Sequence, residues 1–277
     1  MSGPDLHLHS SASDGAHAPA ELVRLALSTG LPAIAITDHD TVSGTAEALA
    51  AREGTDLVVV SGVELSAGYG DRGMHILGYH IDHTDPCLHA RLTELRSIRV
   101  ERAERIVYAL ARDGFRITVD DVLDSADGGS IGRAHIARLL VDTGQAASVS
   151  EAFRTLLGKT APYYIPKPVH TPEEMLAWIT EAGGVAVLAH PGLSGVDDLI
   201  PQLVSAGLAG LEVYHPSHDH GQTVRYAGLA VSLGLIATGG SDFHGLDREG
   251  DALGSVDVPD GAIADLERAR PKRGDAR

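Results

Sequence analysis

The order of apolar and polar residues predicts short strands and amphipathic helices that alternate at both ends of the chain. Residues 5–9 alternate polar and apolar side chains, as a strand with one buried face does. Residues 19–30 carry an apolar stripe that ends at a glycine, which predicts a helix. The same patterns predict strands over 33–37, 57–64 and 74–79 and a helix over 43–52. Strands and helices in this order indicate a parallel sheet or barrel.

A second alternating stretch begins at Thr171, which is followed by Pro172 and by Glu174 in capping-box register. We expect a short helix after residue 260 as the last element. Before it, the patterns predict helices over 171–183, 196–206 and 220–233 and strands over 185–189, 210–213 and 236–238.

The middle of the chain, residues 82–169, shows helical patterning without an obvious strand. Its longest predicted helix, 88–114, is rich in charged residues, and the simplest interpretation is a solvent-exposed face. We expect a helical insertion subdomain at 82–169 that caps the site, between the 1–81 and 170–277 parts of one barrel domain. The alternative is a series of barrel helices with no strand between them.

Histidine and acidic side chains gather at the ends of the predicted strands. His7 and His9 lie on one face of the first strand, about 6.5–7 Å apart, so both can reach one ion. Imidazole and carboxylate ligands without thiolate suit zinc, manganese, iron or magnesium. Any one of these residues alone is explained as a structural histidine or a capping acid, but together they predict a site for two or three ions. The candidates are His7, His9, Asp14, His39, Glu64, His75, His190, Asp242 and His244.

A site for two or three metal ions indicates the kind of reaction that the protein catalyses. Two metal ions roughly 3.5–4 Å apart hold a hydroxide nucleophile and clamp a phosphoryl group for in-line displacement. Phosphoester hydrolysis is therefore the expected chemistry, with a carboxylate such as Glu64 bridging two ions. His215 follows a predicted strand and is the candidate catalytic residue, as a general acid or a phosphate contact. A histidine packed within a loop is the alternative.

A glycine-rich turn at 128–132 leads into a predicted helix that begins with Arg133 and carries His135. Free N–H groups at a helix start and an arginine fork form an anion site, so these two side chains are candidates for binding a second phosphate of the substrate. An ordinary helix cap with a surface arginine is the alternative. Further along, Lys159 and Lys167 flank the tyrosines 163–164, which could stack on a base or belong to the core.

Composition limits the partners and the location. The net charge of −16 over 277 residues argues against binding duplex nucleic acid. No apolar run reaches the roughly 18 residues that span a bilayer, so no membrane contact is expected. The single cysteine, Cys87, excludes an intrachain disulfide, and the first residues show no basic and apolar leader. The expected location is cytoplasmic.

Five motifs resemble those of the PHP (polymerase and histidinol phosphatase) family of metal-dependent phosphoesterases. They are Asp5-Leu6-His7-Leu8-His9-Ser10, Thr37-Asp38-His39-Asp40, Gly62-Val63-Glu64, Ala189-His190-Pro191 and Ser241-Asp242-Phe243-His244. The resemblance implies an α/β fold, a distorted (β/α)7 TIM-like barrel, with three metal ions. It implies that the first ion is held by His7, His9, Glu64 and Asp242, the second by Glu64, His75 and His190, and the third by Asp14, His39 and His244.

The helical insertion and the length of the chain look most like the family's small bacterial phosphoesterases that act on nucleotides. The resemblance implies removal of the 3'-phosphate from nucleoside 3',5'-bisphosphates by a metal-bridged hydroxide, and also trimming of short single-stranded RNA from a 5'-phosphate. The implied cofactors are two or three divalent ions, Mn, Fe or Zn, with Mn favoured. The implied partner is a small phosphorylated substrate.

Three other functions stay open. The first is a phosphatase of histidinol phosphate or of another small monoester, which would share the metal site. The second is a non-catalytic metal-binding regulatory module. The third is hydrolysis of a C–N bond, as in amidohydrolase barrels, although no lysine ends a predicted barrel strand here.

Overall fold

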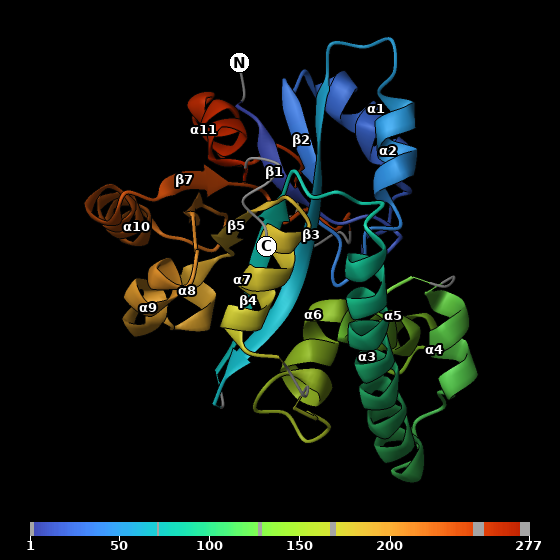
Figure 1. Cartoon of the computed structure of the whole chain (residues 1–277). Helices are drawn as coiled ribbons and strands as arrows, with labels where there is room; N and C mark the ends of the chain where they lie inside the picture. Colours follow the sequence, from blue (N-terminus) through green and yellow to red (C-terminus); the bar gives the residue numbers. More distant parts are fainter. Residues whose placement is uncertain (1–2, 71, 127–128, 167–169, 246–251, 272–277) are drawn as a thin grey trace.

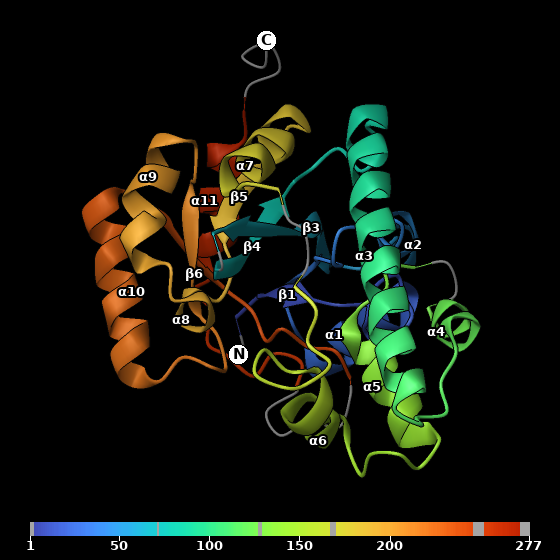
Figure 2. The same cartoon turned by 90° about the horizontal axis from the view of Figure 1, so that it is seen from below.

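One seven-stranded sheet forms the centre of the structure, a computed structural model that describes residues 3–70, 72–126, 129–166, 170–245 and 252–271. The strands lie side by side in sequence order and curl into a half-barrel with helices on its outer side (Figures 1 and 2). The expected α/β barrel-like fold is therefore confirmed. The strands are β1 (Asp5–Leu8), β2 (Ala33–Ile36), β3 (Val58–Tyr69), β4 (Arg72–Tyr79), β5 (Val185–Leu188), β6 (Gly210–Tyr214) and β7 (Ile236–Gly239).

The sheet is parallel except at β4, which runs antiparallel to both of its neighbours. The prediction of a parallel order is wrong there, and β3 continues to Tyr69 instead of ending at Glu64. Only two residues separate β3 from β4, whereas a parallel crossover needs a dozen or more, so the two strands form a hairpin. Because β4 is reversed, His75 near its start lies at the edge where the parallel strands end.

The two edges of the curled sheet meet beside β1. Leu8 forms an isolated parallel bridge with Phe243, and the N–H of His9 donates to the carbonyl of Phe243 at 3.0 Å. Gly240 passes so close to this strand that a Cβ there would lie 2.4 Å from the backbone nitrogen of His7. The buried carboxylate of Asp5 completes the seam by accepting hydrogen bonds from backbone N–H groups of the returning chain.

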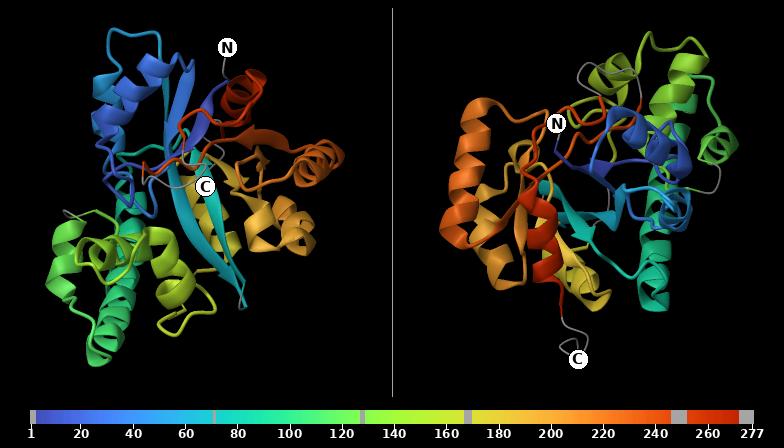
Figure 3. Two further views of the ribbon diagram at one scale, coloured as in Figure 1. Left: turned by 180° about the vertical axis from the view of Figure 1, so that it is seen from behind. Right: turned by 90° about the horizontal axis from the view of Figure 1, so that it is seen from above.

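Helices cover the outside of the sheet and form a separate block at one end (Figures 1 and 3). The covering helices are α1 (Pro19–Thr29), α2 (Thr45–Ala51), α7 (Pro172–Glu181), α8 (Pro191–Ser194), α9 (Ile200–Ser205), α10 (His220–Leu233) and α11 (Gly261–Ala269), with a 3-10 turn at Asp197–Leu199. The block contains α3 (Pro86–Arg112), α4 (Val119–Ser125), α5 (Arg133–Asp142), α6 (Val149–Ala152) and a π-helical turn at Phe153–Leu157.

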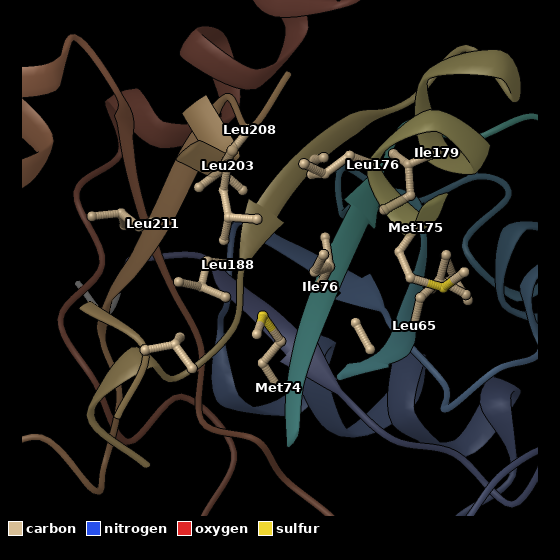
Figure 4. Packing of buried hydrophobic residues seen from close by; sticks show 14 of the residues in the cluster. Leu65, Met74, Ile76, Met175, Leu176, Ile179, Leu188, Leu203, Leu208 and Leu211 are labelled. Atoms are coloured by element: carbon tan, nitrogen blue, oxygen red, sulfur yellow. The ribbon is translucent and has the colours of Figure 1, made fainter. Parts of the chain in front are cut away.

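Helix α3 belongs to both parts of the structure. Leu88, Leu92 and Leu95 in its first half pack into the large core between the sheet and the covering helices, part of which Figure 4 shows. Ile106 and Leu110 in its second half belong to a core made only by the helical block. The block therefore has its own hydrophobic core but is anchored to the barrel through one continuous helix. The predicted boundaries at 82 and 169 stay predictions.

Among the described helices, none is long and apolar enough to cross a membrane.

Replacement of Asp5 by alanine should destabilise the fold. Its Oδ1 and Oδ2 accept hydrogen bonds from the N–H groups of Ser241 and Gly254, both at 2.8 Å. Two buried donors would lose their partner, which costs roughly 2–5 kcal/mol of unfolding free energy. Urea unfolding of Asp5→Ala measures the loss, with Asp265→Ala on exposed α11 as the control. Equal stability of the two variants would contradict this account of the seam.

Candidate metal centre

The structure brings the nine predicted ligands together at the edge of the sheet where the parallel strands end. His7 lies in β1, Glu64 in the middle of β3 and His75 in β4. The others follow strands β1, β2, β5 and β7. Ligand atoms within 4.8 Å of one another form three groups: His9, Asp14, His39 and His244; His7, His9 and Asp242; and His39, Glu64 and His75.

The carboxylate of Glu64 is the centre of this cluster, and its side chain is only 1% exposed. Its Oε1 lies 2.8 Å from Nδ1 of His75 and 3.0 Å from Nε2 of His190. Its Oε2 lies 3.4 Å from Nε2 of His7 and 3.3 Å from Nε2 of His9. Oε2 also lies 2.8 Å from Nδ1 of His39. Each oxygen thus faces its own set of imidazoles, which is the arrangement expected of a carboxylate that bridges two ions.

Two imidazoles reach both Glu64 and Asp242. The Nε2 atoms of His7 and His9, which lie 3.4 and 3.3 Å from Glu64 Oε2, also lie 3.4 and 3.1 Å from Oδ1 of Asp242. Imidazole nitrogens and carboxylate oxygens are the ligands of mixed N/O metal sites. His7, His9 and Asp242 are therefore candidate ligands of one divalent cation, with Glu64 beside them.

The electrostatics of the cluster also favour bound positive charge. Nε2 of His7, both ring nitrogens of His9 and Oε2 of Glu64 are buried without a hydrogen-bond partner. Burial alone would raise the pKa of Glu64, but the neighbouring imidazoles, His39 foremost, hold that pKa well below its usual range. Burial alone would lower the pKa of His9, but Asp242 and Glu64 raise it to about 10. Protons and metal ions thus compete for the same nitrogens.

A tight loop after β1 places Asp14 in the cluster. The buried carboxylate of Asp38 accepts hydrogen bonds from the N–H and the hydroxyl of Ser10, both at 2.7 Å. From the helical block, Arg138 donates to the carbonyl of Asp14. Oδ1 of Asp14 then lies 3.4 Å from Nε2 of His244. The group of candidate ligands that contains Asp14 and His244 therefore depends on both the barrel and the helical block.

Backbone strain is concentrated at this edge of the sheet. The described residues other than glycine with positive φ are Asp40, His80, His190 and Asp242, and all except His80 lie at the cluster. His190, at φ 25°, is the most unusual of them. Such conformations cost of order 1–3 kcal/mol each and persist only where the surroundings enforce them.

Glu212 is a functional residue that the sequence patterns did not indicate. Its fully buried carboxylate lies in β6, with Oε1 2.8 Å from Nδ1 of His7. Its Oε2 accepts a 2.6 Å hydrogen bond from the N–H of His190 and so holds that strained backbone. Glu212 thereby makes Nδ1 of His7 a donor and leaves Nε2 free to bind a metal. The available signal was a single acid within the apolar strand 210–214, since a glutamate is rarely buried unless it is paired.

His215 lies beside the cluster and is not a member of the three groups. Its Nδ1 accepts a 3.1 Å hydrogen bond from the N–H of Ser217, so the proton of the neutral ring is on Nε2. That Nε2 is buried and lies 3.6 Å from Oδ2 of Asp242. The geometry makes His215 a donor directed toward the cluster, and its catalytic role stays a prediction.

A cavity of about 270 Å³ opens over the cluster, between the sheet and the helical block. All the candidate ligands except His7 and His9 line it from the side of the sheet, and Arg99, Arg102 and Arg133 line it from the helical block. The prediction of a solvent-exposed face on the long helix is wrong at Arg99, because this residue is 8% exposed and its Nε lies 2.5 Å from Oδ2 of Asp40. The buried face of α3 carries Leu92, Leu95 and Ala103 at helical spacing, and Arg99 lies among them, so the apolar stripe was the available signal for its burial.

The two predicted phosphate-binding residues take different positions. Arg133 lines the cavity, whereas His135 is buried and does not line it. Nδ1 of His135 accepts a 3.1 Å hydrogen bond from the N–H of Gly132 and so caps the start of α5. Gly128 of the glycine-rich turn lies outside the described residues. Arg102 is the second guanidinium beside Arg133, and nothing in the sequence singled it out.

The chain is similar to known proteins in sequence and in structure. A family model described as the PHP domain matches residues 5–160. The chain is 36% identical to the 3',5'-nucleoside bisphosphate phosphatase of Chromobacterium violaceum, over 94% of this chain and 93% of that protein. It is 34% identical to the 5'-3' exoribonuclease of Haemophilus influenzae, over 87% and 89%. A solved structure of a candidate metal-dependent phosphoesterase from Bifidobacterium adolescentis superimposes with a TM-score of 0.91, at 34% identity and 98% coverage of both chains.

Replacement of Glu212 by glutamine should weaken metal binding about 10- to 100-fold, the usual cost of losing a carboxylate that orients a metal-binding histidine. Glutamine keeps the shape but loses the charge that fixes the tautomer of His7. Calorimetric titration of the metal-free chain with Mn²⁺ measures the change. Glu267→Gln, at an exposed position on α11, is the control. Unchanged affinity in Glu212→Gln would show that Glu212 does not orient the site.

Proposed function

The chain belongs to the PHP family and is a metal-dependent phosphoesterase, and we propose that it removes the 3'-phosphate of nucleoside 3',5'-bisphosphates. The nine candidate ligands would hold the catalytic ions, which on the family pattern are two or three and for which manganese is favoured. The observation that carries the choice of substrate is the pair of arginines, Arg102 and Arg133, on the opposite wall of the cavity.

This pair is fixed by contacts that leave its charge unbalanced. Nε of Arg102 donates to the carbonyl of Ile165 at 2.7 Å, and Arg133 donates to the carbonyl of Leu157 at 2.8 Å. Both guanidinium groups also lie over the ring of Tyr164, at 5.7 and 5.4 Å from its centre. Within the described part of the chain, neither has a carboxylate partner. Arg99, by contrast, is neutralised by Asp40.

The electrostatics of the pair point to an anionic ligand. Burial and the nearby charge of Arg133 lower the pKa of Arg102 to about 10. Burial likewise lowers the pKa of Arg133. Two partly buried cations that repel each other gain stability when a dianion binds between them. A phosphate monoester is such a dianion, and arginine binds it through paired hydrogen bonds.

The two walls of the cavity would have different roles in the reaction. Bound metal ions would supply an activated water molecule and neutralise charge on the phosphoryl group that is transferred. Arg102 and Arg133 would hold the second phosphate of the same substrate and so orient the ribose between the walls. His215 would direct the N–H of Nε2 toward the reacting group beside Asp242. His135 would act only through the helix start that presents Arg133.

The relative named as an exoribonuclease favours a second substrate of the same geometry. A short single-stranded RNA with a 5'-phosphate offers a terminal phosphate for the arginine pair and a phosphodiester for the metal centre. Histidinol phosphate has a single phosphate and would leave the arginine pair unused, so it is the weaker alternative.

Arg102→Ala and Arg133→Ala should each lower kcat/KM for adenosine 3',5'-bisphosphate by about 10- to 100-fold, as expected when a charge-assisted hydrogen bond to phosphate is lost. Their kcat/KM for adenosine 3'-monophosphate, which lacks the second phosphate, should stay within about threefold of wild type. Phosphate release in the presence of Mn²⁺ measures both.

Arg112→Ala is the matched control, because Arg112 ends the same helix α3 with its side chain 77% exposed. Equal losses on the two substrates would contradict binding of a second phosphate by the arginine pair. Preference of the wild-type chain for histidinol phosphate over both nucleotides would contradict the proposed substrate.

A further inference from the structure

A second cavity, of about 190 Å³, lies directly beside the one over the metal centre. The two share part of their walls, including His75, His190, Leu193 and the arginine pair. The second cavity is therefore next to both places where the proposed substrate carries phosphate. Its lining also includes Ala67, Met74, Tyr164 and Leu193, and no role in binding the phosphates accounts for these side chains.

The lining of this cavity comes from three parts of the chain. Ala67 of β3 and Met74 of β4 face each other across the hairpin and form the floor, and Figure 4 shows Met74 at one end of the large core. Leu193 of α8 also lines it. So does Tyr164, which carries the arginines over its ring.

Tyr164 and Tyr163 are adjacent in the sequence but have different surroundings in the structure. Tyr163 donates to Asp113 and packs edge-on against Phe115 in the helical core, so it has the core role. Tyr164 lines the second cavity. Lys167, the second lysine that flanks them, lies outside the described residues.

Leu193 is unusual because it is 63% exposed in a turn that is otherwise tightly held. The N–H of Gly192 donates to Nε2 of the buried His218 at 3.1 Å, and a Cβ at Gly192 would lie 2.7 Å from that ring. The N–H of Leu193 itself bonds to the carbonyl of the strained His190. The turn thus keeps a large apolar side chain in water at the mouth of both cavities.

The two serines of the second cavity already have hydrogen-bond partners. The hydroxyl of Ser66 donates to Oδ2 of Asp40 at 3.1 Å and accepts from Arg99 at 3.1 Å. The hydroxyl of Ser194 donates to the carbonyl of Pro191 at 3.1 Å. Besides Tyr164, the other polar side chains of the lining are two candidate metal ligands and the arginine pair, which the proposed function assigns to the ions and to phosphate. A ring that enters this cavity would meet apolar side chains, imidazoles and guanidinium planes.

We propose that this second cavity binds the nucleobase of the substrate, against Leu193, Tyr164 and the arginine pair. The proposal rests on the proposed function. Recognition is by contact with the faces of the ring, which every base provides, and not by hydrogen bonds to its edge. The ribose then connects a base in this cavity to one phosphate at the metal centre and another at the arginine pair.

A substrate without a base tests this assignment. The wild-type chain with Mn²⁺ should hydrolyse adenosine and uridine 3',5'-bisphosphates with kcat/KM values within about tenfold of each other. The base-free 1-deoxyribose 3,5-bisphosphate should be about 10- to 100-fold poorer, since stacking contributes roughly 1–3 kcal/mol per base. Leu193→Ala should lower kcat/KM about three- to tenfold for the nucleotides, mainly through KM, and leave the base-free compound unchanged.

Val231→Ala is the control for loss of an exposed aliphatic side chain, because Val231 is 84% exposed on α10. Equal hydrolysis of the base-free compound and the nucleotides would overturn the base site and leave the proposed function standing. A preference above about 100-fold for one base would also overturn it. Failure to hydrolyse any of the three bisphosphates, when another phosphate ester is hydrolysed, would overturn the proposed function as well.

Discussion

The burial of Glu64 is the constraint on which the rest of the site depends. An isolated carboxylate inside a protein costs many kcal/mol, so its surroundings must provide positive charge. Here imidazoles reach it from several strands, at 2.8 Å in the case of His75. The imidazoles can reach Glu64 only if these strands bring them to the same edge of the sheet. The curl of the sheet and the antiparallel direction of β4 meet this condition. Glu212 then orients the imidazole of His7 and holds the strained backbone of His190 through its N–H group.

The helical block completes the site by supplying the opposite charge. The chain has a net charge of −16, and yet three arginines face the cavity from α3 and α5. Arg99 joins the block to the barrel through Asp40, beside the candidate ligand His39. Arg102 and Arg133 have no carboxylate partner among the described residues, so their positive charge is available to a ligand. A cavity with metal-binding groups on one wall and guanidinium groups on the other suits a molecule with two phosphates.

The sequence was sufficient to predict which histidines and acids the structure brings together as candidate ligands, because neither core packing nor solubility requires so many of them at the ends of apolar strands. It was also sufficient for the helices, whose apolar periodicity matches the observed elements. It could not give the direction of β4, which depends on the length of a turn between two strands of the same pattern. Arg102 was missed because the charged residues of α3 suggested one exposed face, although Arg102 lies beside the apolar stripe formed by residues such as Leu95 and Ile106. His135 resembled a ligand from its position after a glycine turn, but its contact is a helix cap.

The metal content of the chain tests the central claim most directly. After equilibration with Mn²⁺ and removal of free ions, elemental analysis should find at least two ions per chain in the wild type, as the three groups of candidate ligands predict. Glu64→Ala should lose most of this metal while its circular dichroism remains that of a folded α/β protein. One ion or fewer in the wild type, or undiminished metal in folded Glu64→Ala, would contradict a multi-metal centre built on Glu64.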